Sequence, residues 1–265
     1  MRTFCRSSFL FAALFTMALH GPFVHGEPLS VDAIPVSEEY VLRVWEVDDG
    51  LPNNSIFGIA QTPDGYLWLA TSSGLARFDG ARFTSFLKDA TPGLESNRMR
   101  TVFVARDGAL WIGLERGGVA RRAGDRFETI VPVAPPGTAS TIWTSSFAQD
   151  AAGAVWSGFY SERKVLRWHD GTLSTFSGKE GIGPGQDTSV YADAGGRIWF
   201  TTTEGCGVFD GKRFQSIDST GGGWAHLASA RDGGMWAARG GRLLRYRADG
   251  SHEVIADLGL AVNTL

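Results

Sequence analysis

The chain has 265 residues, of which 43% are hydrophobic and 20% charged, and its formal net charge is −3. This composition is ordinary for a globular protein with a large core, while the 35 glycines indicate many tight turns. The acidic balance argues against nucleic acid as a partner, because nucleic-acid binding needs a basic face.

The first 26 residues are arranged like a secretory signal peptide. Arg2 and Arg6 give a basic start, and an apolar run of eleven residues follows over 9–19. That run is shorter than the roughly 20 residues that span a bilayer. We therefore expect cleavage after Gly26, a linker over 27–39, and export to the periplasmic or extracellular side of a bacterial membrane. An uncleaved membrane anchor is the alternative.

Past this segment, a tryptophan recurs at a nearly fixed interval, with gaps of 43, 45, 43 and 37 residues. Each tryptophan stands in an apolar run between turns rich in Asp and Gly, which are strong hairpin signals. A fixed period of this length is the signature of a repeat architecture. The five tryptophans are Trp68, Trp111, Trp156, Trp199 and Trp236.

The first repeat contains four short apolar runs, separated by three turns that include Asp64-Gly65 and Asp79-Gly80. Four strands at this period predict an all-β fold, a β-propeller of four-stranded blades, over residues 40–265. Five blades are expected near 54–86, 97–130, 141–176, 187–217 and 224–255.

The two ends of this region predict partial units. Residues 40–47 match the fourth strand of a preceding unit, and residues 259–265 match the start of the first unit at 50–56. We expect an incomplete ring and a fragment of a longer protein. The open edges of the first and last blades would then favour self-association, as an alternative to dimerisation in the parent protein.

The periodic tryptophans are expected to be core residues. Leu67 to Ala70 is apolar at every position, which is typical of a strand covered on both faces. Burying each Trp would contribute up to about 4–6 kcal/mol. A ring of tryptophans that stacks on sugars or bases is the alternative.

Three motifs of the first unit resemble the two-component regulator propeller family. They run over 49–53 (DGLPN), 64–71 (DGYLWLAT) and 74–80 (GLARFDG). The resemblance covers about residues 40–265 and is weakest in the third and fifth units. It implies an extracytoplasmic sensor, the input part of a sensor histidine kinase or a diguanylate cyclase. The chain itself is not expected to be an enzyme.

Recognition is expected where the second-to-third turns and the strand entrances meet, at one end of the blades. Mixed charges with Trp and Tyr there suit a small polar molecule or a glycan, whereas the alternative is a solvated rim. Trp143 and Trp224 lie off the Trp period and are expected to contact the ligand, so replacing either with Ala should weaken binding without unfolding. The candidates are Trp143, Trp224, Arg98, Arg116, Tyr160, Glu162, Glu204 and His226.

Two other functions remain open. A propeller lyase similar to streptogramin lyases would use His226 as a base with a metal, near Glu204. A scaffold that binds another protein would show a broad apolar patch on the rim. Turn chemistry accounts for the repeated Asp residues without calcium. We therefore expect no catalytic residue, metal or cofactor in this chain.

Overall fold

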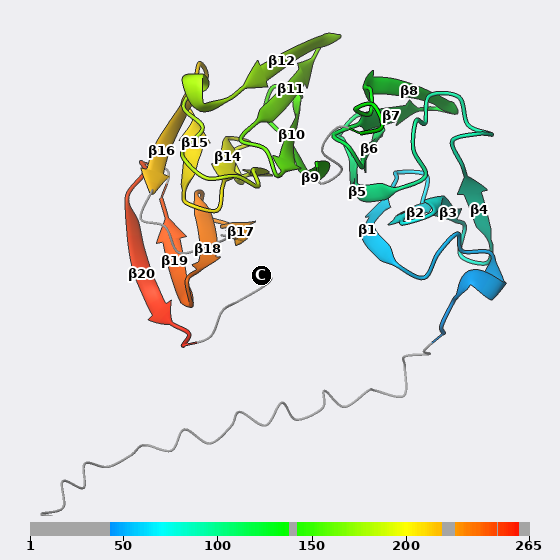
Figure 1. The fold of residues 1–265 in the computed structure, drawn as a ribbon. Coiled ribbons are helices and arrows are strands. Elements are labelled where there is room, and N and C mark those ends of the chain that lie inside the picture. Colours follow the sequence, from blue (N-terminus) through cyan, green and yellow to red (C-terminus); the bar gives the residue numbers. More distant parts are fainter. Residues whose placement is uncertain (1–42, 138–141, 219–225, 248, 260–265) are drawn as a thin grey trace, which may run out of the picture. The chain divides into compact units, whose positions relative to one another are not determined.

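The computed structural model describes residues 43–137, 142–218, 226–247 and 249–259 (Figure 1). The chain divides into two units, Met1–Val44 and Trp45–Leu265, and the second contains every described strand. The expected signal peptide, the linker and Trp224 lie outside the described residues. Within the described residues, no helix is long and apolar enough to cross a membrane.

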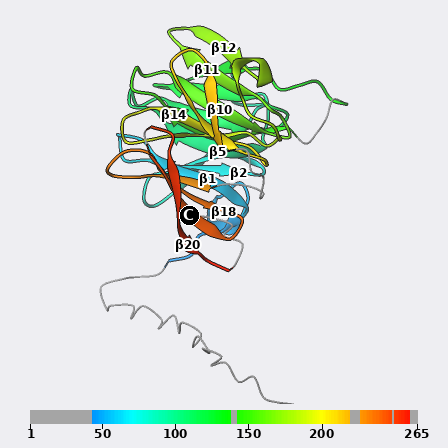
Figure 2. The same ribbon diagram turned by 90° about the vertical axis from the view of Figure 1, so that its left-hand side faces the viewer.

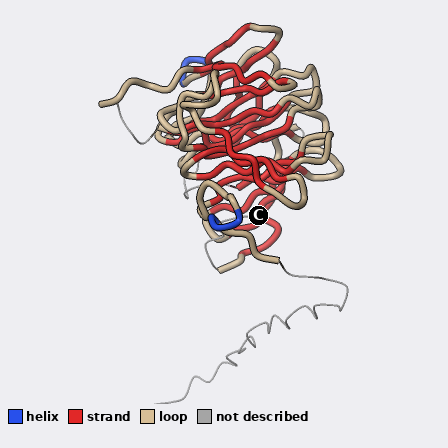
Figure 3. Tube along the Cα trace, turned by 90° about the vertical axis from the view of Figure 1, so that its right-hand side faces the viewer, coloured by secondary structure: helices blue, strands red, loops and turns tan. Residues whose placement is uncertain are grey.

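Strands dominate the second unit, with two short 3₁₀ turns as its only described helices (Figure 3). The described strands form five four-stranded antiparallel sheets, and each sheet keeps its strands in chain order. This arrangement confirms the all-β fold and the expected incomplete β-propeller, with each sheet as one blade.

The strand bounds follow the repeat. The first blade holds β1 (Ile56–Gln61), β2 (Leu67–Thr71), β3 (Gly74–Phe78) and β4 (Phe83–Phe86). The second holds β5 (Met99–Val104), β6 (Leu110–Leu114), β7 (Val119–Ala123) and β8 (Arg126–Val131). The third holds β9 (Trp143–Gln149), β10 (Val155–Tyr160), β11 (Val165–His169) and β12 (Thr172–Phe176). The fourth holds β13 (Ser189–Ala192), β14 (Ile198–Thr201), β15 (Cys206–Phe209) and β16 (Phe214–Asp218). The fifth holds β17 (His226–Ser229), β18 (Met235–Arg239), β19 (Arg242–Tyr246) and β20 (His252–Asp257).

The first strands of successive blades lie next to one another, from β1 through β5, β9 and β13 to β17. Figures 1 and 2 show β1 beside β5. The approach between the third and fourth blades requires glycine. A Cβ at Gly158 would stand 2.3 Å from the carbonyl oxygen of Thr188. Only a residue without a side chain allows the two backbones to meet so closely.

The second strand of each blade contributes to two cores. Trp156 packs against Phe209 and Phe214 of the fourth blade, whereas its neighbour Val155 packs into the core shared with the second blade. This alternation explains why such strands are apolar at every position.

The expectation of core tryptophans is confirmed for four of the five. Trp68, Trp111, Trp156 and Trp199 are at most 3% exposed. Trp236 is only half-buried, which corrects the expectation for the fifth. The other tryptophans pack against the blade that follows them, as Trp199 does against Tyr246. No described sheet follows the fifth blade, so Trp236 lacks that cover.

The segment before the first blade differs from the expected strand over 40–47. Residues 40–42 lie outside the described residues, residues 43–46 form no strand, and Val47–Asp49 is a 3₁₀ turn. The Asp49 carboxylate accepts from the backbone N–H of Glu46, and Gly50 closes the turn at φ 99°. These local bonds favour a turn over an extended strand. At the other end, Gly259 is a bend and residues 260–265 are not described.

Candidate functional site

The turns between second and third strands meet the starts of the first strands at one end of the blades. In the second blade, Met99 pairs with Leu114, which places the start of β5 beside the β6–β7 turn. In the third blade, Trp143 pairs with Tyr160, at the start of β9 and the end of β10. Side chains from these positions gather into one group, which we call the rim cluster: Phe57, Ser96, Arg98, Arg100, Glu115, Arg116, Trp143 and Tyr160.

Aromatic rings and one guanidinium group run through the rim cluster across three blades. The rings of Trp143 and Tyr160 are 4.0 Å apart and 4° from parallel. The Cζ atom of Arg100 lies over Trp143 at 4.8 Å and over Phe57 at 4.6 Å. A cation held against two aromatic faces is attracted to both rings.

This arrangement changes the expected role of Trp143. Tyr160 covers one face of its indole, and Arg100 lies over the same ring, so the second face is covered too. A flat ligand therefore has no open indole face on which to stack. Trp143 offers a ligand its edge.

A carboxylate organises the charged side of the rim cluster. Glu115 accepts a hydrogen bond from Ser96 Oγ at 3.2 Å and lies 3.5 Å from Arg98 Nη1 and 3.7 Å from Arg116 Nη1. Its side chain is 18% exposed, whereas that of Arg98 is 65% exposed. The cluster thus joins a half-buried acceptor to a guanidinium that reaches into solvent.

Glu162 lies in the next hairpin, which is tied to the fourth blade. Its backbone carbonyl accepts from Thr188 Oγ1 at 2.8 Å, and its carboxylate pairs with Lys164. The N–H of Ser161 donates to Asp187 Oδ1 at 2.6 Å. These bonds hold the long turn that follows Tyr160 in place.

The remaining candidates do not join the cluster. Glu204 is exposed in the β14–β15 turn, and His226 begins β17 opposite Ala238. No described contact links either residue to the rim cluster. Among the described residues, no three His, Cys, Asp or Glu side chains are grouped to hold a metal ion.

Four members of the rim cluster are not among the candidates that the sequence predicted: Phe57, Ser96, Arg100 and Glu115. Arg100 is a charged residue within a first strand, next to the buried Met99. A charge at such a position was the available signal, because an unpaired charge is costly among packed strands.

Comparison with known proteins agrees with this fold. Residues 50–73 match the family model described as two component regulator propeller. This segment is therefore similar to one repeat of that family. This match covers β1, β2, residues 50–53 of the first motif and the whole second motif, and it confirms the resemblance there. No curated protein matches the chain.

Solved structures with similar folds come from different kinds of protein. A streptogramin B lyase structure is 16% identical with a TM-score of 0.59, over 80% of this chain and 71% of that one. The extracellular domain assigned to a one-component system of B. thetaiotaomicron is 18% identical with a TM-score of 0.50. That match covers 76% of this chain and 35% of the domain. At these identities, the comparisons establish a shared propeller-like fold and nothing finer.

Proposed function

We propose that this chain is the ligand-binding input propeller of an exported signal-transduction protein, and that its ligand binds at the rim cluster. The match of residues 50–73 to the regulator propeller model and a fold shared with the extracellular domain assigned to a one-component system support this role. The parent protein would be a sensor histidine kinase or a related regulator, of which this chain is one part. The role proposed for this chain is binding and not catalysis.

The proposal rests on the Glu115 carboxylate and the two arginines that lie beside it, Arg98 and Arg116. Arg98 is anchored to Glu115 by one nitrogen at 3.5 Å, yet 65% of its side chain remains exposed. Its other N–H groups can donate to a ligand, and the Glu115 carboxylate can accept from one. Charge-assisted hydrogen bonds of this kind are about twice as strong as neutral ones.

The chemistry of the cluster favours a polar small molecule or a glycan. Hydroxyl groups both donate and accept, so one ligand can engage Arg98 and Glu115 together. The edge of Trp143 lies beside them, because Glu115 and Trp143 form a backbone bridge. A ligand with hydroxyl groups and a small apolar face would match both features.

A thermal-shift screen tests the proposal. The chain is heated alone and with a panel of mono- and oligosaccharides, and any hit is repeated with Arg98→Ala. At a ligand concentration of 100 Kd, binding should stabilise the fold by about 2.7 kcal/mol, which corresponds to a rise of several degrees in Tm. Arg98→Ala should lose this rise.

The matched control is Arg82→Ala, an exposed arginine in the β3–β4 turn at the other end of the first blade. It should keep the full rise. A hit that loses the same rise in both variants, or a panel without any hit, would overturn the proposal. Metal-dependent turnover that disappears in His226→Ala would instead support a lyase.

A further inference from the structure

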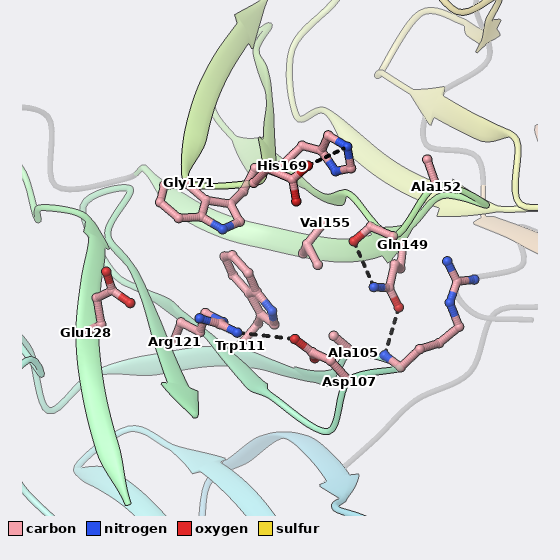
Figure 4. Close-up of a pocket in the computed structure, with 14 residues that line it drawn as sticks. Ala105, Asp107, Trp111, Arg121, Glu128, Gln149, Ala152, Val155, His169 and Gly171 are labelled. Atoms are coloured by element: carbon pink, nitrogen blue, oxygen red, sulfur yellow. Dashed lines mark hydrogen bonds and ion pairs between the residues drawn. The ribbon is translucent and has the colours of Figure 1, made fainter. Parts of the chain in front are cut away.

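A cavity of about 670 Å³ lies between the second and third blades, at the end opposite the rim cluster (Figure 4). Its walls come from the β5–β6, β9–β10 and β11–β12 turns and from the strands beside them. Trp111 and Trp168 form the aromatic part of the lining, with ring centroids 6.4 Å apart. Ala105, Asp107 and Arg121 line the same cavity.

A comparison of the repeats shows that the second blade lacks an acceptor for the indole N–H of its tryptophan. In three blades, the residue six positions before the periodic Trp accepts a hydrogen bond from the indole N–H. Thr62 accepts from Trp68 at 3.0 Å, Asp150 from Trp156 at 2.8 Å, and Asp193 from Trp199 at 3.1 Å. The tryptophan of the second blade belongs to the same series.

In the second blade, that position is Ala105, which has no acceptor. Among the described residues, none accepts a hydrogen bond from Trp111 Nε1, although the Trp111 residue is only 3% exposed. The nitrogen is not enclosed by protein either, so it faces the cavity. This donor is therefore available to a group that enters the cavity.

In the second and third blades, an arginine on the neighbouring strand lies beside the indole. Arg167 pairs across the strands with Trp156, and its Nε lies 3.8 Å from the Asp150 carboxylate. Arg121 pairs in the same way with Trp111, and its Cζ lies 6.0 Å from the centre of the indole. The second blade thus keeps the indole and guanidinium donors of the third blade, and the carboxylate between them is missing.

We propose that this cavity binds the carboxylate group of a small organic ligand, which occupies the place that Asp150 fills in the third blade. The indole N–H of Trp111 and the guanidinium of Arg121 would donate to it. Trp168 provides an apolar wall for the rest of the ligand. This site shares no residue with the rim cluster, so it stands apart from the function proposed above.

The existing partner of Arg121 does not fill the site. Arg121 Nη2 lies 3.2 Å from Asp107 Oδ2, but the Asp107 side chain is 58% exposed, and exposed ion pairs are weak. The Oδ1 atom of Asp107 caps its own turn by accepting from the N–H of Ala109. Among the described contacts, no other acceptor binds the Arg121 side chain. Its remaining N–H groups can therefore donate to a ligand.

The fifth blade provides an internal contrast. It also has an alanine, Ala230, six positions before its Trp236, and a cavity of about 530 Å³ lies beside that indole. There, however, Arg245 donates to the carbonyls of Tyr246, Met235 and Gly233 and to Asp232. Its donors are consumed within the chain, so we assign the carboxylate site to the second blade alone.

Indole N–H resonances give a direct test. The ¹⁵N-labelled chain is titrated with benzoate and with benzamide, which have the same shape and differ in charge, in a buffer free of carboxylates. The Trp111 resonance is the one that Trp111→Phe removes. Benzoate should shift it and benzamide should not, while the Trp156 resonance should stay in place because Asp150 already holds its N–H.

Two variants address the site itself. Ala105→Asp supplies the acceptor of the third blade and should abolish the benzoate response. Arg121→Gln should raise the Kd for benzoate at least about tenfold. Its matched control is Arg126→Gln, at an exposed arginine that lines no part of this cavity. That variant should bind benzoate as the unaltered chain does.

The other tryptophan resonances report whether each variant is folded. If Ala105→Asp does not fold, the benzoate affinity of Arg121→Gln tests the proposal. Equal shifts with benzoate and benzamide would overturn the proposal. So would a Trp111 resonance that benzoate leaves unmoved, or a benzoate response that persists at full strength in Arg121→Gln.

Discussion

The parallel rings of Trp143 and Tyr160, 4.0 Å apart, join the start of β9 to the end of β10 where the third blade faces the second. Arg100 extends this stack to the second blade by lying over Trp143. Trp143 therefore contributes to packing between blades as well as to the rim. This finding revises the expectation that Trp143→Ala would leave folding untouched.

The first prediction concerns this stack. Trp143→Ala and Tyr160→Ala should each lower the free energy of unfolding, and the double variant should lose less than the sum. Stacked aromatic pairs contribute about 0.5–1.5 kcal/mol beyond buried area, which is the expected coupling energy. Urea unfolding of the four proteins measures it. Strict additivity would show that the two rings are independent.

The second prediction compares two acceptors of tryptophan N–H groups. Asp193 is 5% exposed and accepts from Trp199 Nε1 and from the Arg197 backbone and side chain. Asp193→Ala should cost about 2–4 kcal/mol, because it removes a buried carboxylate that accepts several hydrogen bonds, one of them from the Arg197 side chain. Thr62→Ala removes the hydroxyl that accepts from Trp68 and donates to the exposed Asp64, and it should cost only about 1–2 kcal/mol. Equal losses in urea unfolding would contradict this ranking.

The third prediction concerns acid. Hydrogen bonds from the N–H of Arg213, the Gln215 side chain and the N–H of Lys212 lower the pKa of Asp210 to about 2. An unfolded Asp titrates near about 3.9. The folded pKa is the lower one, so this stabilisation is present above pH of about 4 and is lost as the pH falls toward 2.

Asp210→Asn keeps an acceptor for the turn and removes the titrating group. Urea unfolding from pH 5 to pH 2 should therefore show a shallower loss of stability in this variant than in the unaltered chain. Identical slopes would mean that Asp210 has the same pKa in the folded and unfolded chains.

The fourth prediction concerns the exposed edge of the first blade. Ile59 on β1 is 60% exposed, whereas its neighbour Ala60 packs into the core shared with the second blade. Ile59 therefore points away from that core. The chain should self-associate with rising concentration, and Ile59→Thr should weaken this association in sedimentation velocity. Leu173→Thr, at a 41% exposed residue of β12, is the control and should associate like the unaltered chain.

Much of the fold could be predicted because the same pattern of turns and apolar runs occurs five times in the sequence. The Asp-Gly turns and the periodic tryptophans place the strands, and the fully apolar second strands indicate sheets on both sides. The position of Trp236 shows where this reasoning fails, since its burial depends on a neighbouring blade and not on its own sequence. Residues 43–47 differ from the prediction for a second reason, because the bond from the Glu46 N–H to the Asp49 side chain favours a turn over the strand that their pattern suggested.

The candidate site was predictable only in part. Arg98, Arg116, Trp143 and Tyr160 do gather at one end of the blades, because the repeat fixes where turns and strand starts meet. The stack that covers both faces of Trp143 depends on Arg100, which reaches across from the next blade. Contacts between blades of this kind have no local pattern in the sequence.

The central claim is that the rim cluster binds the ligand through Glu115. Isothermal titration calorimetry with a saccharide found in the thermal screen tests it most directly. Glu115→Gln keeps the shape of the side chain and removes its charge, and it should raise the Kd at least about tenfold. Asp125→Asn, at an exposed carboxylate of the β7–β8 turn, should leave the Kd unchanged. An unchanged Kd in Glu115→Gln would contradict the account.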